Sequence, residues 1–156
     1  MSEVLLSIRI PLAPKSKERP RVALRGGRAR AYTPKETEAW EAAAEWHIRS
    51  AIGHRWVSVD VPVSVEMVAV SERCAERPKG VSLEAWKRGG RVHRVGRTDA
   101  DNELKAGMDA LSRAAFWTDD NLAVDVRAVK VWGAVGERAC VEMIVRKIVA
   151  VAEENG

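Results

Sequence analysis

The sequence predicts a single α+β domain in which helices pack on one mixed sheet and the elements follow the order β-α-β-α-β-β. Four segments rich in β-branched residues have the length and pattern of strands: 4–11, 57–70, 121–132 and 138–149. Two segments between them, 33–52 and 101–113, carry apolar residues three or four positions apart, as amphipathic helices do. With 156 residues, the chain suffices for one such core and is too short for two ordinary domains.

The first predicted strand runs from Val4 to Pro11, where apolar and polar residues alternate until a proline ends the pattern. Residues 15–31 then change character, because prolines and glycines interrupt them and Glu18 is the single acid among many bases. The bases are Lys15, Lys17, Arg19, Arg21, Arg25, Arg28 and Arg30. We predict a long basic loop without regular structure, which is either a solvated connection or a phosphate-binding surface.

The first helix is predicted to begin at Thr33-Pro34, with the Thr33 hydroxyl as cap and the proline in the first helical position. It should run to about Ile52, because Gly53 favours a helix end. Its larger and apolar residues fall on one stripe: Trp40, Ala43, Ala44, His47 and Ile48. We expect this stripe to face the core.

The strand at 57–70 is followed by a segment, 71–95, whose structure the sequence leaves open. Its charges, prolines and glycines fit either a flexible flap or an inserted turn around Leu83-Glu84-Ala85-Trp86. Its bases are candidates for a second phosphate-binding strip, although a solvated loop is the more frequent explanation. They are Lys79, Lys87, Arg88, Arg91 and Arg94.

The helix at 101–113 has Leu104, Met108 and Leu111 as its core stripe. The last two strands are joined around Gly133 and Gly136, which suggests a hairpin. Residues 150–156 should fray.

Composition restricts the function only loosely. The net charge of +4 favours a polyanionic partner mildly. The N-terminus lacks the apolar stretch of a signal peptide and no segment has the length of a membrane span, so we expect a soluble, cytoplasmic protein without a membrane partner. Cys74 and Cys140 lack the spacing of a zinc site or a disulfide scaffold, and we expect both to be reduced.

Four carboxylates in two tight pairs carry the chemistry: Asp99, Asp101, Asp119 and Asp120. Clustered carboxylates repel one another unless a cation neutralises them, which predicts a hard divalent ion, Mg²⁺ or alternatively Mn²⁺. Lys105 lies one helical turn beyond Asp101 and therefore emerges on the same face. It is positioned either to contact a phosphate or to form a plain ion pair, whereas we interpret Asp109, a turn further, as structural.

Competing motifs fail on spacing. A calcium loop that starts at Asp99 would need glycine at its sixth position and glutamate at its twelfth, where the chain has Leu104 and Ala110. No glycine-rich loop ending in Lys-Ser or Lys-Thr occurs, which leaves no support for a nucleotide cofactor.

One motif runs from Asp99-Ala-Asp101-Asn102 through Lys105 to Asp109-Ala110-Leu111, and continues with Phe116-Trp117-Thr-Asp119-Asp120 and Lys130. This motif closely resembles the RusA family of Holliday junction resolvases. A second motif resembles the same family: Lys17-Glu-Arg19-Pro20-Arg21 followed by Tyr32-Thr33-Pro34. The resemblance implies a homodimeric, Mg²⁺-dependent endonuclease that makes paired nicks at four-way DNA junctions, often encoded by phages and prophages. The family's essential carboxylates correspond to Asp99, Asp101 and Asp120, and its essential lysine to Lys105.

From this resemblance we predict that Asp99, Asp101 and Asp120 hold the metal, that Lys105 stabilises the transition state, and that the loop bases and Lys130 bind DNA. One geometric limit applies. The helix is ~20 Å long at 1.5 Å per residue, so Asp120 barely returns to Asp101 unless the helix is shorter, the chain folds back tightly, or a dimer completes the site. Two alternatives stay open: a catalytically inert protein that binds branched DNA, and a metal-dependent phosphohydrolase of small substrates.

Overall fold

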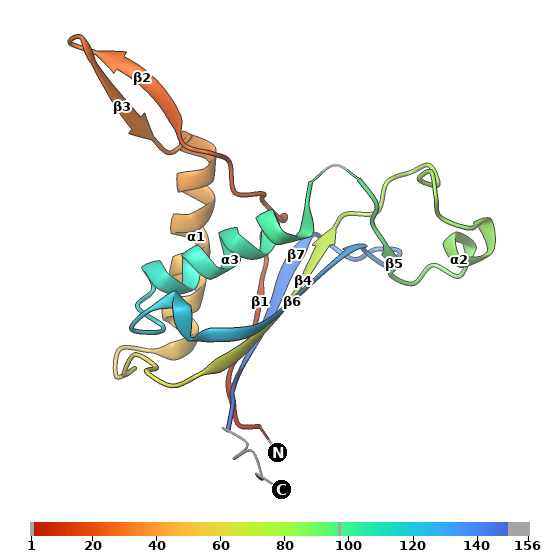
Figure 1. Ribbon diagram of the computed structural model, residues 1–156. Helices are drawn as coiled ribbons and strands as arrows, with labels where there is room; N and C mark the ends of the chain where they lie inside the picture. The colour runs from red at the N-terminus through yellow and green to blue at the C-terminus, as the bar shows by residue number, and fades with distance from the viewer. Residues whose placement is uncertain (1, 97, 150–156) are drawn as a thin grey trace, which may run out of the picture.

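The computed structural model describes residues 2–96 and 98–149. In chain order the elements are β1 Val4–Ile10, β2 Arg21–Arg25, β3 Arg28–Tyr32, α1 Lys35–Ile52, β4 Val63–Ser71, α2 Leu83–Lys87, β5 Val92–His93, α3 Ala100–Arg113, a 3-10 turn η1 Asp120–Leu122, β6 Ala123–Trp132 and β7 Cys140–Lys147. Five strands form one sheet in the order β1-β7-β4-β6-β5 (Figure 1). Because β6 runs parallel to β4 while the other pairs are antiparallel, the sheet is mixed, and the predicted α+β class is confirmed.

The predicted hairpin of the last two strands is wrong. β4 separates β6 from β7 and pairs with both. After β6, the chain crosses the end of β4, where the amide of Gly133 donates to the carbonyl of Ser71 at 2.8 Å. The glycines at 133 and 136 therefore serve a crossing over a neighbouring strand rather than a tight turn.

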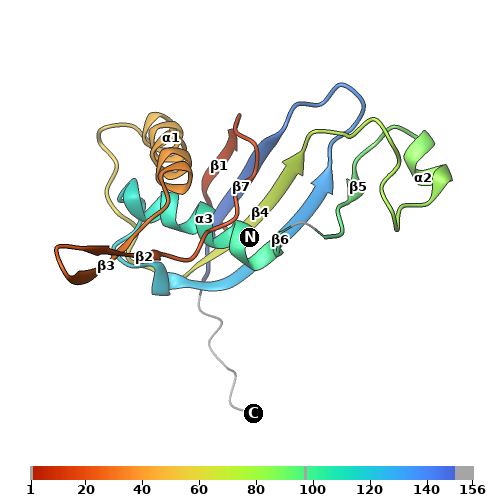
Figure 2. The ribbon, with the colours of Figure 1, turned by 90° about the horizontal axis from the view of Figure 1, so that it is seen from above.

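α1 and α3 lie on the same side of the sheet (Figure 2). The core between the two layers contains Ile48 of α1, Leu111 of α3 and Met67 and Met143 of the sheet, each at most 2% exposed. Gly107 allows α3 to approach closely, because a Cβ there would lie 3.0 Å from the Met67 sulfur. The α3 residues Leu104 and Leu111 are buried, as their spacing predicted.

α1 has the predicted length and ends at Gly53, whose φ of 79° suits glycine. Its start differs from the prediction, since Pro34 occupies the cap position and no side chain caps the helix. The buried stripe also differs: it contains Thr37, Glu41, Ala44 and Ile48. A glutamate on a buried stripe requires a partner, and that partner proves to lie near the candidate site.

The prediction of an irregular loop at 15–31 is wrong for most of its length. β2 and β3 form an antiparallel hairpin that projects away from the rest of the molecule (Figure 1). Gly26 and Gly27 have φ values of 59° and 73°, the positive angles that a two-residue hairpin turn requires at both positions. The glycines thus create regular structure here instead of preventing it.

The segment 71–95 contains the short helix α2, at the residues where the sequence allowed an inserted turn. Arg73 anchors it: the guanidinium carbon lies 3.4 Å from the centre of the Trp86 ring, and its nitrogens donate to the carbonyls of Trp86 and Gly90. The predicted frayed tail, 150–156, lies outside the described residues. Within the described ranges, every helix is too short or too polar to cross a membrane.

Candidate active site

The beginning of α3 carries the first pair of predicted site residues. Asp99 is the N-cap residue, with extended backbone angles, and its side chain makes no capping hydrogen bond. Asp101 and Lys105 follow one turn apart on the exposed face of the helix. Within residues 2–96 and 98–149, the side chains of Asp99, Asp101 and Lys105 form no hydrogen bond or ion pair, so they remain free to meet a ligand.

A buried ion pair supports this helix start from below. Arg94 donates through Nη2 to both carboxylate oxygens of Glu103, at 2.8 and 2.9 Å, and both side chains are 3% exposed. The Thr98 hydroxyl also donates to Glu103, and Arg94 Nη1 lies 3.4 Å from that hydroxyl. A nearly dry pair, in which one guanidinium nitrogen contacts both carboxylate oxygens, fixes the loop before α3 against the helix itself.

Lys130 supports the same loop from β6. Its ammonium donates to the carbonyl of Gly96 at 3.2 Å and to the carbonyl of Thr98. The amide of Arg94 in turn donates to the Lys130 carbonyl at 2.9 Å. In the described structure, the ammonium of Lys130, one of the predicted DNA-binding bases, contacts the backbone that leads into Asp99.

Lys17 links the N-terminal segment to the same helix. Its ammonium contacts Glu41 of α1 at 2.8 Å and Asp109 of α3 at 2.7 Å, and its amide donates to the carbonyl of Asn102 at 3.1 Å. Partial burial opposes the charged form of Lys17, but the hydrogen bonds to Asp109 and Glu41 outweigh it and raise the pKa of the ammonium. Asp109 therefore has the structural role predicted for it.

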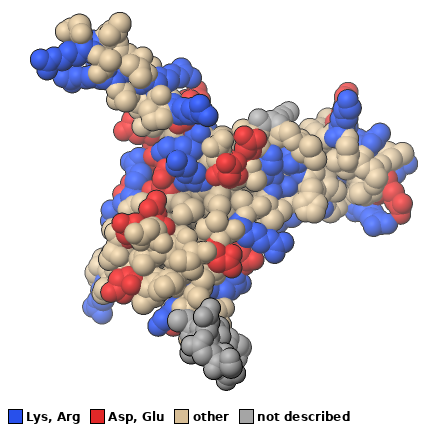
Figure 3. All heavy atoms as spheres, viewed as in Figure 1, with Lys and Arg blue, Asp and Glu red and all other residues tan. Residues whose placement is uncertain are grey.

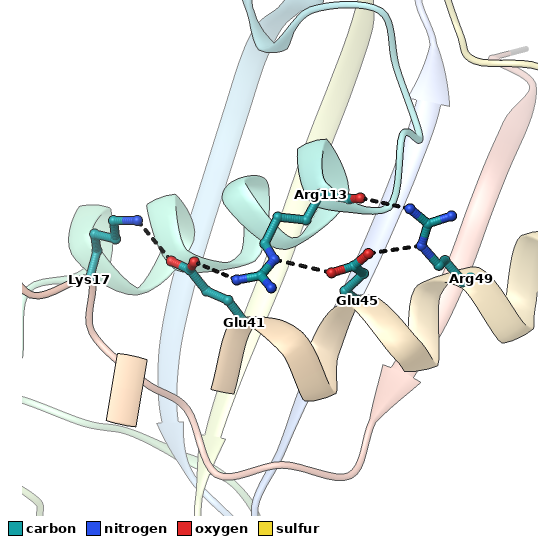
Figure 4. A network of polar contacts seen from close by, with 5 residues as sticks. All are labelled: Lys17, Glu41, Glu45, Arg49 and Arg113. Atoms are coloured by element: carbon teal, nitrogen blue, oxygen red, sulfur yellow. Dashed lines mark hydrogen bonds and ion pairs between the residues drawn. The ribbon is translucent and has the colours of Figure 1, made fainter. Parts of the chain in front are cut away.

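Figure 4 shows how this contact continues between the two helices. Arg113 of α3 reaches Glu41 at 3.4 Å and Glu45 at 3.1 Å, and Arg49 contacts Glu45 at 2.9 Å and the carbonyl of Arg113 at 3.0 Å. The row of alternating charges holds α1 along α3. It also provides the partners that the buried Glu41 requires.

The second pair of acids lies at the opposite end of α3. Asp119 accepts a hydrogen bond from the amide of Asn121 at 2.9 Å, and Asp120 is exposed at the start of η1. The intervening helix has 14 residues, which corresponds to about 21 Å. The length of β6 gives a similar separation between the two pairs of acids. Lys130 of β6 touches the loop before α3, and Ala123, which follows η1, lies seven residues earlier in the same strand, at about 3.3 Å per residue.

The predicted metal ligands are therefore divided: Asp99 and Asp101 share one end of α3, and Asp120 lies at the other. Among the described residues, no group of three or more His, Cys, Asp or Glu side chains gathers at a spacing suited to a metal ion. Asp99 and Asp101 alone fit a magnesium ion in part, because Mg²⁺ often takes one or two carboxylates and keeps several waters. Both carboxylates are exposed and without a partner in the described ranges, as such binding requires.

The predicted DNA-binding bases also divide into two groups. Lys15 pairs with Glu18 and Glu36 at 3.2 and 3.3 Å. Its ammonium, like those of Lys17 and Lys130, therefore makes contacts within the fold. Arg21 reaches Glu18 at 3.5 Å but stays 67% exposed. The fully available bases are Arg19, Arg25, Arg28 and Arg30, which are exposed and have no ionic partner within residues 2–96 and 98–149.

The bases of the 71–95 segment separate in the same way. Arg94 is buried on Glu103, and Arg91 contacts Glu137 at 2.7 Å and also Glu142, so both have acidic partners within the fold. Lys and Arg side chains remain visible over the hairpin and over the α2 segment, and acidic side chains come to the surface between them, where α3 begins (Figure 3).

Sequence reasoning missed Arg94, Thr98 and Glu103 as the support of the site. One sequence feature indicates them: Glu103 lies three to four positions before Ala106 and Gly107, and seven before Ala110, on the stripe of α3 that is buried. A carboxylate on a buried stripe is costly without a cation, so it calls for a buried arginine or lysine nearby in space.

The model of the family described as Endodeoxyribonuclease RusA matches residues 11–144, and the chain therefore belongs to the RusA family. It is 59% identical over 34 residues to the crossover junction endodeoxyribonuclease RusA of Escherichia coli O139:H28 (strain E24377A / ETEC), and 56% identical over 34 residues to those of Enterobacteria phage 82 and Shigella sonnei (strain Ss046). Each match covers 22% of this chain and 28% of the relative's length.

Proposed function

We propose that the protein is an endodeoxyribonuclease that resolves four-way DNA junctions by paired, divalent-metal-dependent hydrolysis of phosphodiester bonds. One observation supports this most: Asp99 and Asp101, two carboxylates without a partner among the described residues, stand at a helix start that is held by a buried ion pair, in a chain of the RusA family. Rigid support of exposed charges is what a site needs to hold a ligand in a defined geometry.

Each residue of the helix start has a separate task in this proposal. Asp99 and Asp101 hold the cation, Mg²⁺ in our proposal, which when bound activates a water and offsets charge on the phosphate. Lys105, one turn along the same face, donates to a nonbridging phosphate oxygen and stabilises the charge that develops there. The network of Arg94, Thr98 and Glu103 keeps the helix start in place while the DNA strand is bound.

A homodimer completes the site. Since α3 is 14 residues long and Asp120 follows its far end, the chain cannot bring its own Asp120 to its own Asp101. In a two-fold dimer the same surface of each copy faces the other, so an antiparallel arrangement of the two α3 helices brings Asp120 of the partner subunit to Asp101. Two such shared sites suit a four-way junction, whose arms are related by approximate two-fold symmetry.

The first experiment is cleavage of a mobile four-way DNA junction in the presence of Mg²⁺ by the wild type and by Asp101→Asn. We expect paired nicks from the wild type, and unchanged binding without cleavage from the variant, because the amide keeps the shape and removes the charge. Asp60→Asn, at an exposed aspartate before β4, is the matched control and should cut normally. A wild type that binds junctions with Mg²⁺ or Mn²⁺ but never cuts them would favour the inert DNA-binding alternative.

Mixing two inactive variants tests whether the site is shared. A heterodimer of Asp101→Asn and Asp120→Asn contains one site with both changes and one site with neither, provided that each site takes Asp120 from the partner subunit. The mixture should therefore regain single nicks. If each chain used its own Asp120, both sites would stay damaged and the mixture would be as inactive as its components.

A further inference from the structure

The β2–β3 hairpin has two chemically different faces. Side chains alternate between the faces of a strand, and the register pairs Arg21 with Tyr32 and Arg25 with Arg28. One face therefore carries Arg21, Ala23, Arg25, Arg28, Arg30 and Tyr32. The other carries Val22, Leu24, Ala29 and Ala31, and is apolar throughout.

The apolar face has no cover within the described part of the chain. Val22 is 68% exposed and Leu24 is 79% exposed. Among the described strands, β2 and β3 pair only with each other, outside the five-stranded sheet, and the hairpin projects away from the body (Figure 1). Isolated two-stranded hairpins are marginal in water, so an exposed apolar face on one is a cost unless a ligand covers it.

Charge restricts what that ligand is. Four arginines lie on the opposite face, only a strand's thickness away, and any occupant of the apolar face comes close to them. A second copy of the hairpin would add four more arginines, which repel the first four. DNA supplies both complementary surfaces, because its phosphates attract the arginines and its base pairs have apolar planar faces.

We infer that the apolar face of the hairpin packs against base-pair faces laid open at the crossover of branched DNA, while the arginine face contacts the phosphates of the strands that meet there. In a continuous duplex, neighbouring bases cover these faces and only their edges reach the grooves. At a branch point the stack is interrupted, and apolar side chains are able to occupy the gap, as they do in proteins that insert wedges between base steps. This inference rests on the proposed substrate and assigns Val22 and Leu24 a role in selecting it.

The test compares the binding of a four-way junction with that of a linear duplex of the same sequence, in EDTA so that nothing is cut. Val22→Thr/Leu24→Thr keeps strand-forming residues in the hairpin but removes most of the apolar surface. We expect junction affinity to fall about tenfold and duplex affinity to change less than about twofold. Val22→Ile/Leu24→Ile, which keeps the face apolar, should bind as the wild type does, and Val57→Thr, at an 83% exposed valine outside the hairpin, is the second control.

A fluorescent 2-aminopurine at the crossover gives an independent readout, because its emission reports stacking. Wild type should change that emission and the threonine variant should not. Equal losses on junction and duplex, or no loss, would overturn the inference, as would a change from dimer to monomer in sedimentation of the threonine variant. Cleavage by the wild type is measured separately: a protein that needs Val22 and Leu24 for junction binding and yet never cuts refutes the proposed function and leaves this inference standing.

Discussion

The body of the molecule and the β2–β3 hairpin use basic residues in opposite ways. In the body, Arg94, Lys17 and Lys130 each contact carboxylates or carbonyls at hydrogen-bonding distance. On the hairpin, Arg25 and Arg28 are exposed and lack an ionic partner within the described residues. A chain with many bases thus contains cations that hold the fold and cations that are left for a ligand, and only the identity of their neighbours separates the two groups.

The largest effect that this difference predicts is in the body. Glu103→Gln leaves the charge of Arg94 buried without its counter-ion, which should lower the free energy of unfolding by about 3–5 kcal/mol. Urea denaturation followed by circular dichroism measures it. The double change Arg94→Met/Glu103→Leu removes both charges and should recover most of that loss. If Glu103→Gln cost no more than a surface substitution, the ion pair would not be the support of the site that we describe.

A smaller, pH-dependent effect is expected at Glu137. Hydrogen bonds from Arg91, with a further one from the Ala134 amide, hold the pKa of this carboxyl at about 2, against an ordinary 4.5. Since the folded-state pKa is the lower one, the contribution is full above pH 4.5 and is lost as the pH falls from 4.5 towards 2. Glu137→Gln should cost roughly 1–2 kcal/mol at neutral pH, after allowance for solvent screening, and should flatten the acid limb.

Thermal unfolding across this pH range measures the effect of Glu137. Glu84→Gln is the matched control, because Glu84 also pairs with an arginine, Arg88, but both side chains are more than 70% exposed. It should leave the acid limb unchanged. Parallel curves for Glu137→Gln and the wild type would contradict the depressed pKa.

The smallest effect on stability is expected on the hairpin. Arg25→Gln/Arg28→Gln should change the free energy of unfolding by less than about 0.5 kcal/mol, because neither guanidinium has a partner to lose in the part of the chain that the structure describes. The same variant should lower the slope of log affinity against log salt for junction DNA by about 2. A measured loss of stability comparable to that of Glu103→Gln would erase the distinction between hairpin and body.

The helices and the position of Asp99 and Asp101 were predictable because local periodicity determines them. The 3.6-residue pattern located α1 and α3 within a residue or two. The predicted helix length set a limit at which Asp120 barely returns to Asp101, but it left open whether the helix is shorter, the chain folds back or a dimer completes the site. The sheet order was not predictable in the same way. β7 pairs with β1 and β4, far away in sequence, and no local feature of residues 140–147 indicates that choice.

The hairpin was missed for a more specific reason. Gly26-Gly27 was interpreted as a break in structure, but two glycines between alternating segments also form a two-residue turn. The alternation was present in Arg21–Arg25 and Arg28–Tyr32, where arginines on one face alternate with apolar residues on the other. A search for period-two patterns on both sides of Gly26-Gly27 would have found it.

The position of β7 has a consequence for the synthesis of the protein. β7 fills the gap between β1 and β4, although it is the last strand of the sheet in chain order. Until residues 140–147 have left the ribosome, β1 lacks its partner strand in the described sheet and β4 offers an open edge on that side. The sheet therefore closes late and through contacts that are distant in sequence, which makes folding slow. A growing chain consequently exposes its basic hairpin well before it has a stable core, and the sheet surface on which α3 packs is complete only when that final strand has docked.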